Sequence, residues 1–249
     1  MDLSIFVFIL VGFVAQLIDG ALGMAYGVSS NAFLLSLGIP PKYASASVHA
    51  AEVVTTGVSG LAHWRFGNIH FDLARRLVIP GVIGAAIGAY LLTQVNGDVI
   101  KPYIAIYLAI MGIVIIWKAF REVALRHVRS WLLPLGLAGG FMDAIGGGGW
   151  GPIVTTTLVA RGNEPRFTVG SVNLTEFFVT LSQSIIFMLT LRSGILDYGR
   201  IILGLLIGGV LAAPLAAYAA KRLPRRPFMV LVGVLIIALS IRTLILTLG

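Results

Sequence analysis

Apolar residues fill most of this chain in long runs, and polar residues are confined to the short gaps between them. Six of the runs are close to the 20 residues or so that a helix needs to cross a bilayer. A β-barrel would show short segments of alternating polarity instead, so the runs predict membrane-spanning helices. The expected helices cover residues 44–64, 75–95, 102–120, 167–190, 201–220 and 227–246.

Two further apolar runs, at residues 4–36 and 131–160, are interrupted near their middle by glycine. A continuous helix of 33 residues would be about 50 Å long, too long for an upright span. Glycine costs about 1 kcal/mol relative to alanine inside a helix, and residues 146–149 are four glycines in a row. Each run is therefore interpreted as two short helices of roughly 15 residues that form a hairpin.

The second half of the chain repeats the first. A shift of 124 positions lays residues 136–176 on residues 12–52 without a gap, and Asp143 then falls on Asp19. Such a repeat indicates two halves of one plan and no independent soluble domain. The chain divides into a first membrane repeat at residues 1–120, a basic cytoplasmic connector at 121–130 and a second membrane repeat at 131–249.

The basic residues indicate how the halves are oriented. If both hairpins enter and leave on one face, the halves are inverted and 13 of the 18 basic residues lie in cytoplasmic loops. If each interrupted run crossed once, the halves would be parallel and the count inside would fall to 10. The bias favours inversion with both termini outside, but fits re-entrant and fully spanning hairpins equally. We therefore predict an all-α polytopic membrane protein with two inverted structural repeats, each a glycine-broken re-entrant helical hairpin plus three transmembrane helices.

Composition agrees with a membrane protein and narrows its partners. Hydrophobic residues make up 58% of the chain and charged residues 11%, against about 25% charged residues in soluble domains. The net charge of +8 lies mostly in the short loops, where it orients helices, so the expected partner is the lipid bilayer and not nucleic acid. Cysteine is absent, which excludes disulfides and cysteine-bound metals, and the sequence predicts no cofactor.

A polar stripe follows the helix expected at residues 44–64. Its members recur at spacings of 4, 3, 4, 3 and 4, which places them on one helical face. Serine, threonine and asparagine in such stripes can simply join membrane helices. A carboxylate near mid-membrane costs about 2.5–3.5 kcal/mol, so Glu52 and Glu176 are functional candidates. The stripe comprises Ser45, His49, Glu52, Thr56, Ser59 and His63, and its counterpart Asn173, Glu176, Thr180 and Gln183.

Asp19 and Asp143 lie at the expected hairpin turns. Either can cap the second short helix of its hairpin, and the helix N-termini so formed would attract an anion. Broken helices of inverted repeats that meet near the midplane are the plan of many secondary transporters. The alternative is an intramembrane hydrolase that uses Asp19 and Asp143 as a carboxylate pair. His49 and Glu52 have no third partner in sequence, which argues against a metal.

At these residues the chain resembles a known family. Both halves contain D-x-x-x-G-x-x-x-G, starting at Asp19 and at Asp143, and the first half continues with L-G-I-P-P-x-x-A-S-A-S-V at residues 37–48. The second half has R-G-N-E-P-R-F-T-V-G-S-V at residues 161–172. This order of features resembles the sulfite exporter TauE/SafE family over essentially the whole chain. The resemblance implies export of small sulfur-containing anions, such as sulfite or sulfoacetate, across a bacterial inner membrane.

A binding site for such an anion is expected where the hairpins meet the polar stripes. Its donors would be backbone N–H groups, neutral side chains and His49, whose ordinary pKa of about 6.5 makes its charge switchable. We expect Glu52 and Glu176 to be protonated, or paired with a donor, while the anion is bound, which makes proton coupling one mechanism. The candidate residues are Asp19, Gly20, Gly23, Ser47, His49, Glu52, Asp143, Gly147, Gly148, Ser171, Asn173 and Glu176.

Glycine pairs in two of the expected helices bear on oligomeric state. Gly84-xxx-Gly88 and Gly204-xxx-Gly208 allow helices to approach closely. The contact can lie within one chain or between the chains of a homodimer, and the pattern leaves both open.

Overall fold

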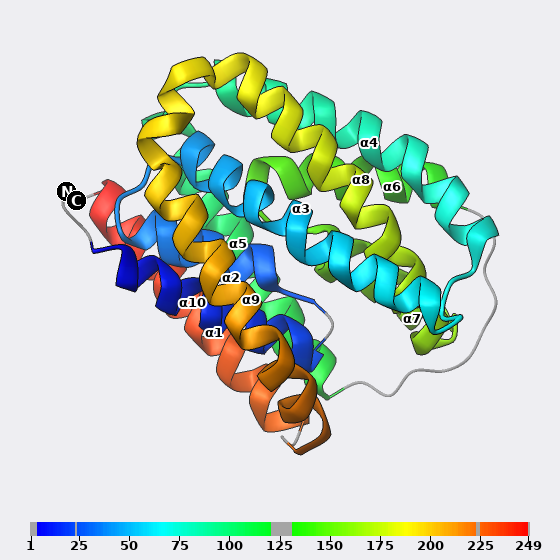
Figure 1. Ribbon diagram of the computed structural model, residues 1–249. Helices are drawn as coiled ribbons and strands as arrows, with labels where there is room; N and C mark the ends of the chain where they lie inside the picture. The colour runs from blue at the N-terminus through cyan, green and yellow to red at the C-terminus, as the bar shows by residue number, and fades with distance from the viewer. Residues whose placement is uncertain (1–3, 23, 121–130, 223–224, 249) are drawn as a thin grey trace.

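The computed structural model describes residues 4–22, 24–120, 131–222 and 225–248, and within these ranges every regular element is a helix (Figure 1). The expected connector at 121–130 lies outside the described residues. The first half contains α1 (Ile5–Leu22), α2 (Tyr26–Ser36), α3 (Pro41–Arg65), α4 (Phe71–Gln94) and α5 (Gly97–Ala119). The second half contains α6 (Leu132–Gly146), the π-helix η1 (Trp150–Thr155), α7 (Thr156–Ala160), α8 (Pro165–Leu191), the 3₁₀-helix η2 (Arg192–Tyr198), α9 (Gly199–Arg222) and α10 (Arg225–Leu248).

Six long helices lie where the apolar runs predicted them. Four stretches are long and apolar enough to cross a membrane: α4, α5, α10, and a continuous stretch at Arg166–Ala213 that includes α8 and most of α9. The 25 residues of α3 would span about 37 Å, but the polar stripe lowers the hydropathy of that helix. The prediction of an all-α polytopic membrane protein is confirmed.

Both interrupted runs are broken helices, and the breaks lie at equivalent positions. α1 ends at Leu22 and α2 begins at Tyr26, while α6 ends at Gly146 and η1 begins at Trp150, 124 residues further on. The second short segment is 11 residues long in each half, because η1 and α7 together match α2. The chain turns through backbone conformations with positive φ, which stop a right-handed helix.

The two breaks pack against each other inside the protein. A Cβ atom added to Gly27 would lie 2.7 Å from Gly148 Cα, and one added to Gly151 would lie 3.1 Å from Met24 Cβ. Met24 and Tyr26 are also buried. Non-helical backbone at membrane depth is tolerated where protein surrounds it, and these contacts provide that surrounding.

Each broken helix packs on a long helix of the other half, α1 on α9 and α6 on α4. Gly208 faces Ile9 of α1, and its counterpart Gly84 faces Leu137 of α6, each so closely that a side chain would meet backbone. The glycine pairs of the sequence therefore serve contacts within one chain.

Equivalent helices from the two halves also pack together, and they run in opposite directions. At one end of the α3–α8 pair, the rings of Tyr43 and Tyr198 stack with centroids 4.1 Å apart. At the other end, Asn173 of α8 donates to Ser59 of α3 over 2.9 Å. Figure 1 shows α3 and α8 crossing the middle of the molecule in this antiparallel arrangement.

Candidate functional site

A cavity of about 280 Å³ lies between α1, α2, α3 and α8, so both halves contribute to its wall. Three carboxyl side chains line it, and none of the described lining residues is Lys or Arg. A pocket of about 300 Å³ is at the small end of ligand sites, which suits a small solute. The lining residues are Gln16, Asp19, Tyr26, Glu52, Thr55, Thr56, Ser59, His63, Val169, Asn173 and Glu176.

The cavity follows the polar stripe of α3 from Glu52 to His63, about 16 Å at 1.5 Å per residue. Beyond His63, Asn68 Nδ2 lies 3.4 Å from His63 Nδ1, and Arg166 Nε donates to Asn68 Oδ1 over 2.6 Å. The cavity is therefore lined by carboxyl groups, and Arg166 lies beyond its His63 end.

The two aspartates of the repeat hold the second short segments of the broken helices. Asp19 Oδ1 accepts the backbone N–H of Tyr26 over 3.3 Å. Asp143 Oδ1 accepts the N–H groups of Gly149 and Trp150 over 2.6 and 2.8 Å. Each carboxylate reaches across the break from the preceding helix, so it satisfies amides that the short segment leaves open. The capping that the sequence suggested is present in this longer-range form.

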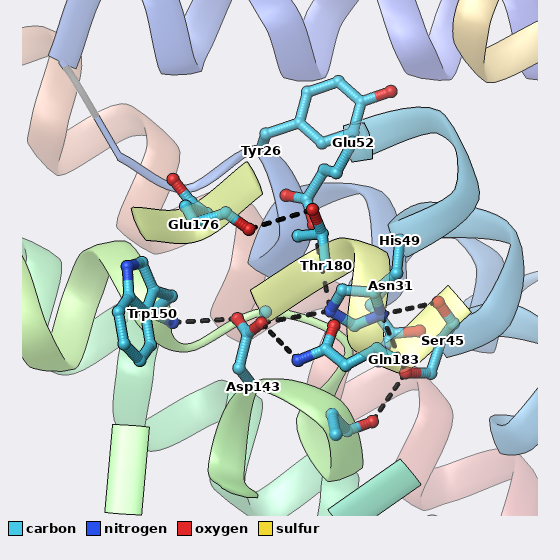
Figure 2. Close-up of polar contacts among 12 residues, drawn as sticks. Tyr26, Asn31, Ser45, His49, Glu52, Asp143, Trp150, Glu176, Thr180 and Gln183 are labelled. Atoms are coloured by element: carbon cyan, nitrogen blue, oxygen red, sulfur yellow. Dashed lines mark hydrogen bonds and ion pairs between the residues drawn. The ribbon is translucent and has the colours of Figure 1, made fainter. Parts of the chain in front are cut away.

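Asp143 is the centre of a buried polar network (Figure 2). Its Oδ2 atom accepts from Gln183 Nε2 over 2.8 Å and lies 3.2 Å from His49 Nε2. Ser45 donates to the carbonyl of Ala144 over 2.6 Å, and Asn31 donates to the carbonyl of Gly146. The network therefore ties α3, α8 and α2 to the end of α6.

The contacts of His49 show how many protons this network holds. Its Nδ1 atom lies 2.8 Å from the carbonyl oxygen of Ser45, which can only accept, so Nδ1 carries a proton. Nε2 faces the Asp143 carboxyl group, so one further proton lies between them. The pair is an imidazolium with a carboxylate, or two neutral groups sharing that proton, and its net charge is zero in both cases. In this structure His49 therefore contacts Asp143 and is not among the residues that line the cavity.

The two glutamates differ in how far they face the cavity. Glu52 is 4% exposed, and its Oε2 atom lies 3.8 Å from His49 Nε2. That Oε2 atom has no hydrogen-bond partner among the described residues. Glu176 is half-buried and lines the cavity. A second, small hollow at the helix breaks is lined by both glutamates and by Asp19 and Asp143.

The remaining candidates separate into three groups. Asn173 lines the cavity, and Gly148 lines the small hollow. Ser171 Oγ instead accepts the backbone N–H of His70 over 2.8 Å, and Ser47 is fully buried outside the residues that line either space. Gly147 lies in the second break, Gly20 lies in the last turn of α1, and Gly23 lies outside the described residues.

The family described as Sulfite exporter TauE/SafE matches residues 8–243. The chain belongs to the TauE/SafE family. It is 46% identical over 251 residues to the probable membrane transporter protein YtnM of Bacillus subtilis, an alignment that covers 97% of this chain and 83% of that protein. A second Bacillus subtilis protein, the probable membrane transporter protein YjnA, is 22% identical over 250 residues, which cover 94% of this chain and 97% of that protein. No solved structure matches the chain.

Membership of the TauE/SafE family makes this protein an integral, multi-pass membrane transporter and not an enzyme. The intramembrane hydrolase considered for Asp19 and Asp143 is therefore set aside. Among the described residues, no three His, Asp or Glu side chains are placed to hold a metal ion.

Lys118 has a position that the sequence reasoning missed in this TauE/SafE protein. The run at 102–120 placed it at the membrane boundary, but its Nζ atom lies 3.2 Å from Met24 Sδ and donates to Thr156. Its counterpart 124 residues on, Arg242, donates to the carbonyl of Ser36 at the end of α2. In each half, a basic side chain therefore contacts the second short segment of the other half. The sequence could have indicated this, because Lys118 and Arg242 occupy equivalent positions in the repeat.

Gln183 and Tyr26 were also missed as site residues. Gln183 appeared in the α8 stripe only as a residue that could join helices, but it donates to Asp143. Tyr26 lines the cavity, and its hydroxyl donates to the carbonyl of Leu205 over 3.3 Å. The repeat carried the signal for Tyr26, because that residue matches Trp150.

Proposed function

We propose that the protein exports a small sulfur-containing anion, such as sulfite or an organosulfonate, across the bacterial plasma membrane by alternating access between inverted repeats. The observation that carries the proposal is the carboxyl-lined cavity between the halves, at the buried helix breaks. The family description, Sulfite exporter, supports the substrate class. The antiparallel packing of α3 with α8 supports inverted halves.

The charges at the two ends of the cavity support its orientation. The rim beyond His63 carries Arg166, and α3 ends at Arg65. By the positive-inside rule, this end faces the cytoplasm and both termini lie outside. The cavity then opens towards the compartment from which an exporter takes its substrate.

The absence of a fixed cation among the described lining residues shapes the proposed mechanism. An ionised Asp19, Glu52 or Glu176 would repel an anion in the cavity, where water is scarce and charges are poorly screened. We propose that the anion binds together with protons on the glutamates, and that neutral donors such as Asn173 and Ser59 hold it. Coupling of export to protons follows from this requirement.

Counterflow in proteoliposomes tests the function. Purified protein should exchange labelled substrate for unlabelled substrate without chemical change when sulfite, sulfoacetate, taurine and thiosulfate are compared. Thr56→Trp should abolish exchange, because Thr56 lines the cavity. Val58→Trp on the same helix is the matched control, because Val58 is 67% exposed, and it should exchange like the parent. Failure to exchange any of the four compounds would reject the substrate class.

A further inference from the structure

The cavity has a counterpart in the repeat where the equivalent side chains are buried. A shift of 124 positions exchanges Glu52 with Glu176, which both line the cavity, and converts the other lining residues into equivalents outside it. Ser59 becomes Gln183, His63 becomes Phe187 and Asn173 becomes His49, and these three equivalents are no more than 1% exposed. Asp19 becomes Asp143, which is 2% exposed. One half of a symmetric plan is therefore open, and the other is closed.

The closed side is held by a specific set of contacts. His49 and Gln183 both meet the Asp143 carboxyl group, and the ring of Phe187 stacks over His49 with centroids 6.3 Å apart. Beyond Phe187, Tyr43 and Tyr198 stack at the same end of the molecule. Polar and aromatic layers together exclude solvent from this side.

The equivalent residues on the open side make different contacts. Asn173 donates to Ser59, and Asp19 accepts the Tyr26 amide. The side chains of Asn173, Ser59 and Asp19 all line the cavity. The chemistry needed for closure is present, because an amide N–H and a hydroxyl can both donate to a carboxylate.

We propose that Asp19, Ser59 and Asn173 form a second gate, which closes the cavity in the opposite state as Asp143, Gln183 and His49 close its counterpart here. The inference rests on the proposed alternating access. Each of the helices α3 and α8 carries residues of both gates. A movement of these helices that closes one gate therefore opens the other. The two gates differ in strength, since His49 can form a charge-assisted contact with a carboxylate, whereas Asn173 can offer only a neutral amide. The His49 gate therefore favours the state with the cavity open.

A pair of matched cysteine reporters distinguishes the two states. Thr56 lines the cavity, whereas its equivalent Thr180 is fully buried, and each hydroxyl donates to the carbonyl four residues earlier in its own helix. Neither belongs to a proposed gate. The chain has no native cysteine, so Thr56→Cys and Thr180→Cys can each be followed alone in the full-length protein with N-ethylmaleimide.

Each gate substitution should shift the pattern of labelling towards Thr180→Cys. Without gate substitutions, Thr56→Cys should react much faster than Thr180→Cys. His49→Asn weakens the closed gate and Asn173→His strengthens the open one, so each should lower the ratio of the two rates by about tenfold or more, the factor for one hydrogen bond to a charged group. Asn173→His lies on the open side, so it tests the proposal even if His49→Asn fails to fold.

An unchanged ratio in both variants would overturn the second gate. So would a rise of both rates together, because loosened packing exposes both sides at once. The outcome is separable from that of the proposed function, because labelling needs no substrate. A lowered ratio without exchange of any sulfur compound tested supports the gates and rejects the substrate class. Exchange with a fixed ratio supports the substrate class and rejects the gates.

Discussion

Asp143 and Asp19 occupy equivalent positions in the two halves, but their surroundings differ. Asp143 is met by His49, Gln183 and two backbone amides, while Asp19 accepts the Tyr26 amide and faces the cavity. The partners differ because the second half places Asn173 where the first has His49. The comparison shows that equivalent aspartates of a repeat can have different roles: one holds a buried hydrogen-bond network together, and the other lines a cavity.

The two helix breaks differ in the same sense. The second uses Gly147 and Gly148, with φ of 66° and 157°, while the first uses Ala25 with φ of 92°. Glycine adopts such angles readily, whereas a side chain in the left-handed region costs about 1–2 kcal/mol. The second break is thus the closely packed one, and the first carries a modest strain.

The largest effect is expected where the second break touches the first. Gly148→Ala places a methyl group against the backbone of Val28 and Gly27 at a φ of 157°. Overpacking and backbone strain together should cost about 2–6 kcal/mol, so little folded protein should remain. Size-exclusion chromatography of a fluorescent fusion measures the folded yield. Gly199→Ala, with nothing within 4 Å, should match the parent, and a normal yield of Gly148→Ala would refute the tight contact.

The aspartates themselves give the next effect. Asp143→Asn leaves His49 buried beside a neutral amide and should cost about 3–5 kcal/mol, the range for breaking a buried pair. Asp19→Asn loses part of one contact, to the Tyr26 amide, and should cost about 1 kcal/mol. Unfolding in detergent, followed by temperature and by SDS titration, compares them. Equal losses of stability would mean that Asp143 and Asp19 contribute equally to stability, which would contradict the difference in their contacts.

The fold was largely predictable from the sequence, because its determinants are local. Glycines at the breaks and apolar runs of membrane length locate the helices within a few residues, and Pro41 and Pro165 begin α3 and α8. The polar stripe also identified which face of α3 meets the cavity, since Glu52 and His63 both line it. Periodicity alone gave this face.

The state of the site was not predictable, because the repeat makes both sides equivalent in sequence. His49 is predicted to bind the anion, and periodicity did not show that its Nε2 atom lies 3.2 Å from Asp143 Oδ2. Lys118 reaches Met24 through a long flexible side chain, and hydropathy does not report such a reach. Contacts between distant segments, such as Gln183 with Asp143, follow from tertiary packing, which the periodicity of one helix does not report.

The two glutamates should differ in their effect on pH dependence. If one proton must accompany the anion, transport should fall about tenfold per pH unit above the titration range, because the ionised carboxylate repels the substrate. Glu176 faces the cavity more than Glu52, so Glu176→Gln should flatten this fall more than Glu52→Gln. Counterflow between pH 5.5 and 8 measures the slopes. Slopes like the parent's in both variants would place the proton elsewhere.

The smallest effect is expected at the serines that the sequence paired, and it separates structural from binding roles. Ser171 Oγ accepts the N–H of His70, so Ser171→Ala leaves that amide without its partner and should cost about 1 kcal/mol. Ser47 is equally buried, but its hydroxyl has no hydrogen-bond partner among the described residues. Ser47→Ala removes a polar group that gains nothing from burial, so stability should stay within about 0.5 kcal/mol of the parent or rise. Unfolding in detergent gives both values, and counterflow should be unchanged in each variant, since neither serine lines the cavity. A loss of exchange without a loss of stability would show that these serines belong to the binding site. Equal destabilisation by the two substitutions would show that both serines have the same structural role.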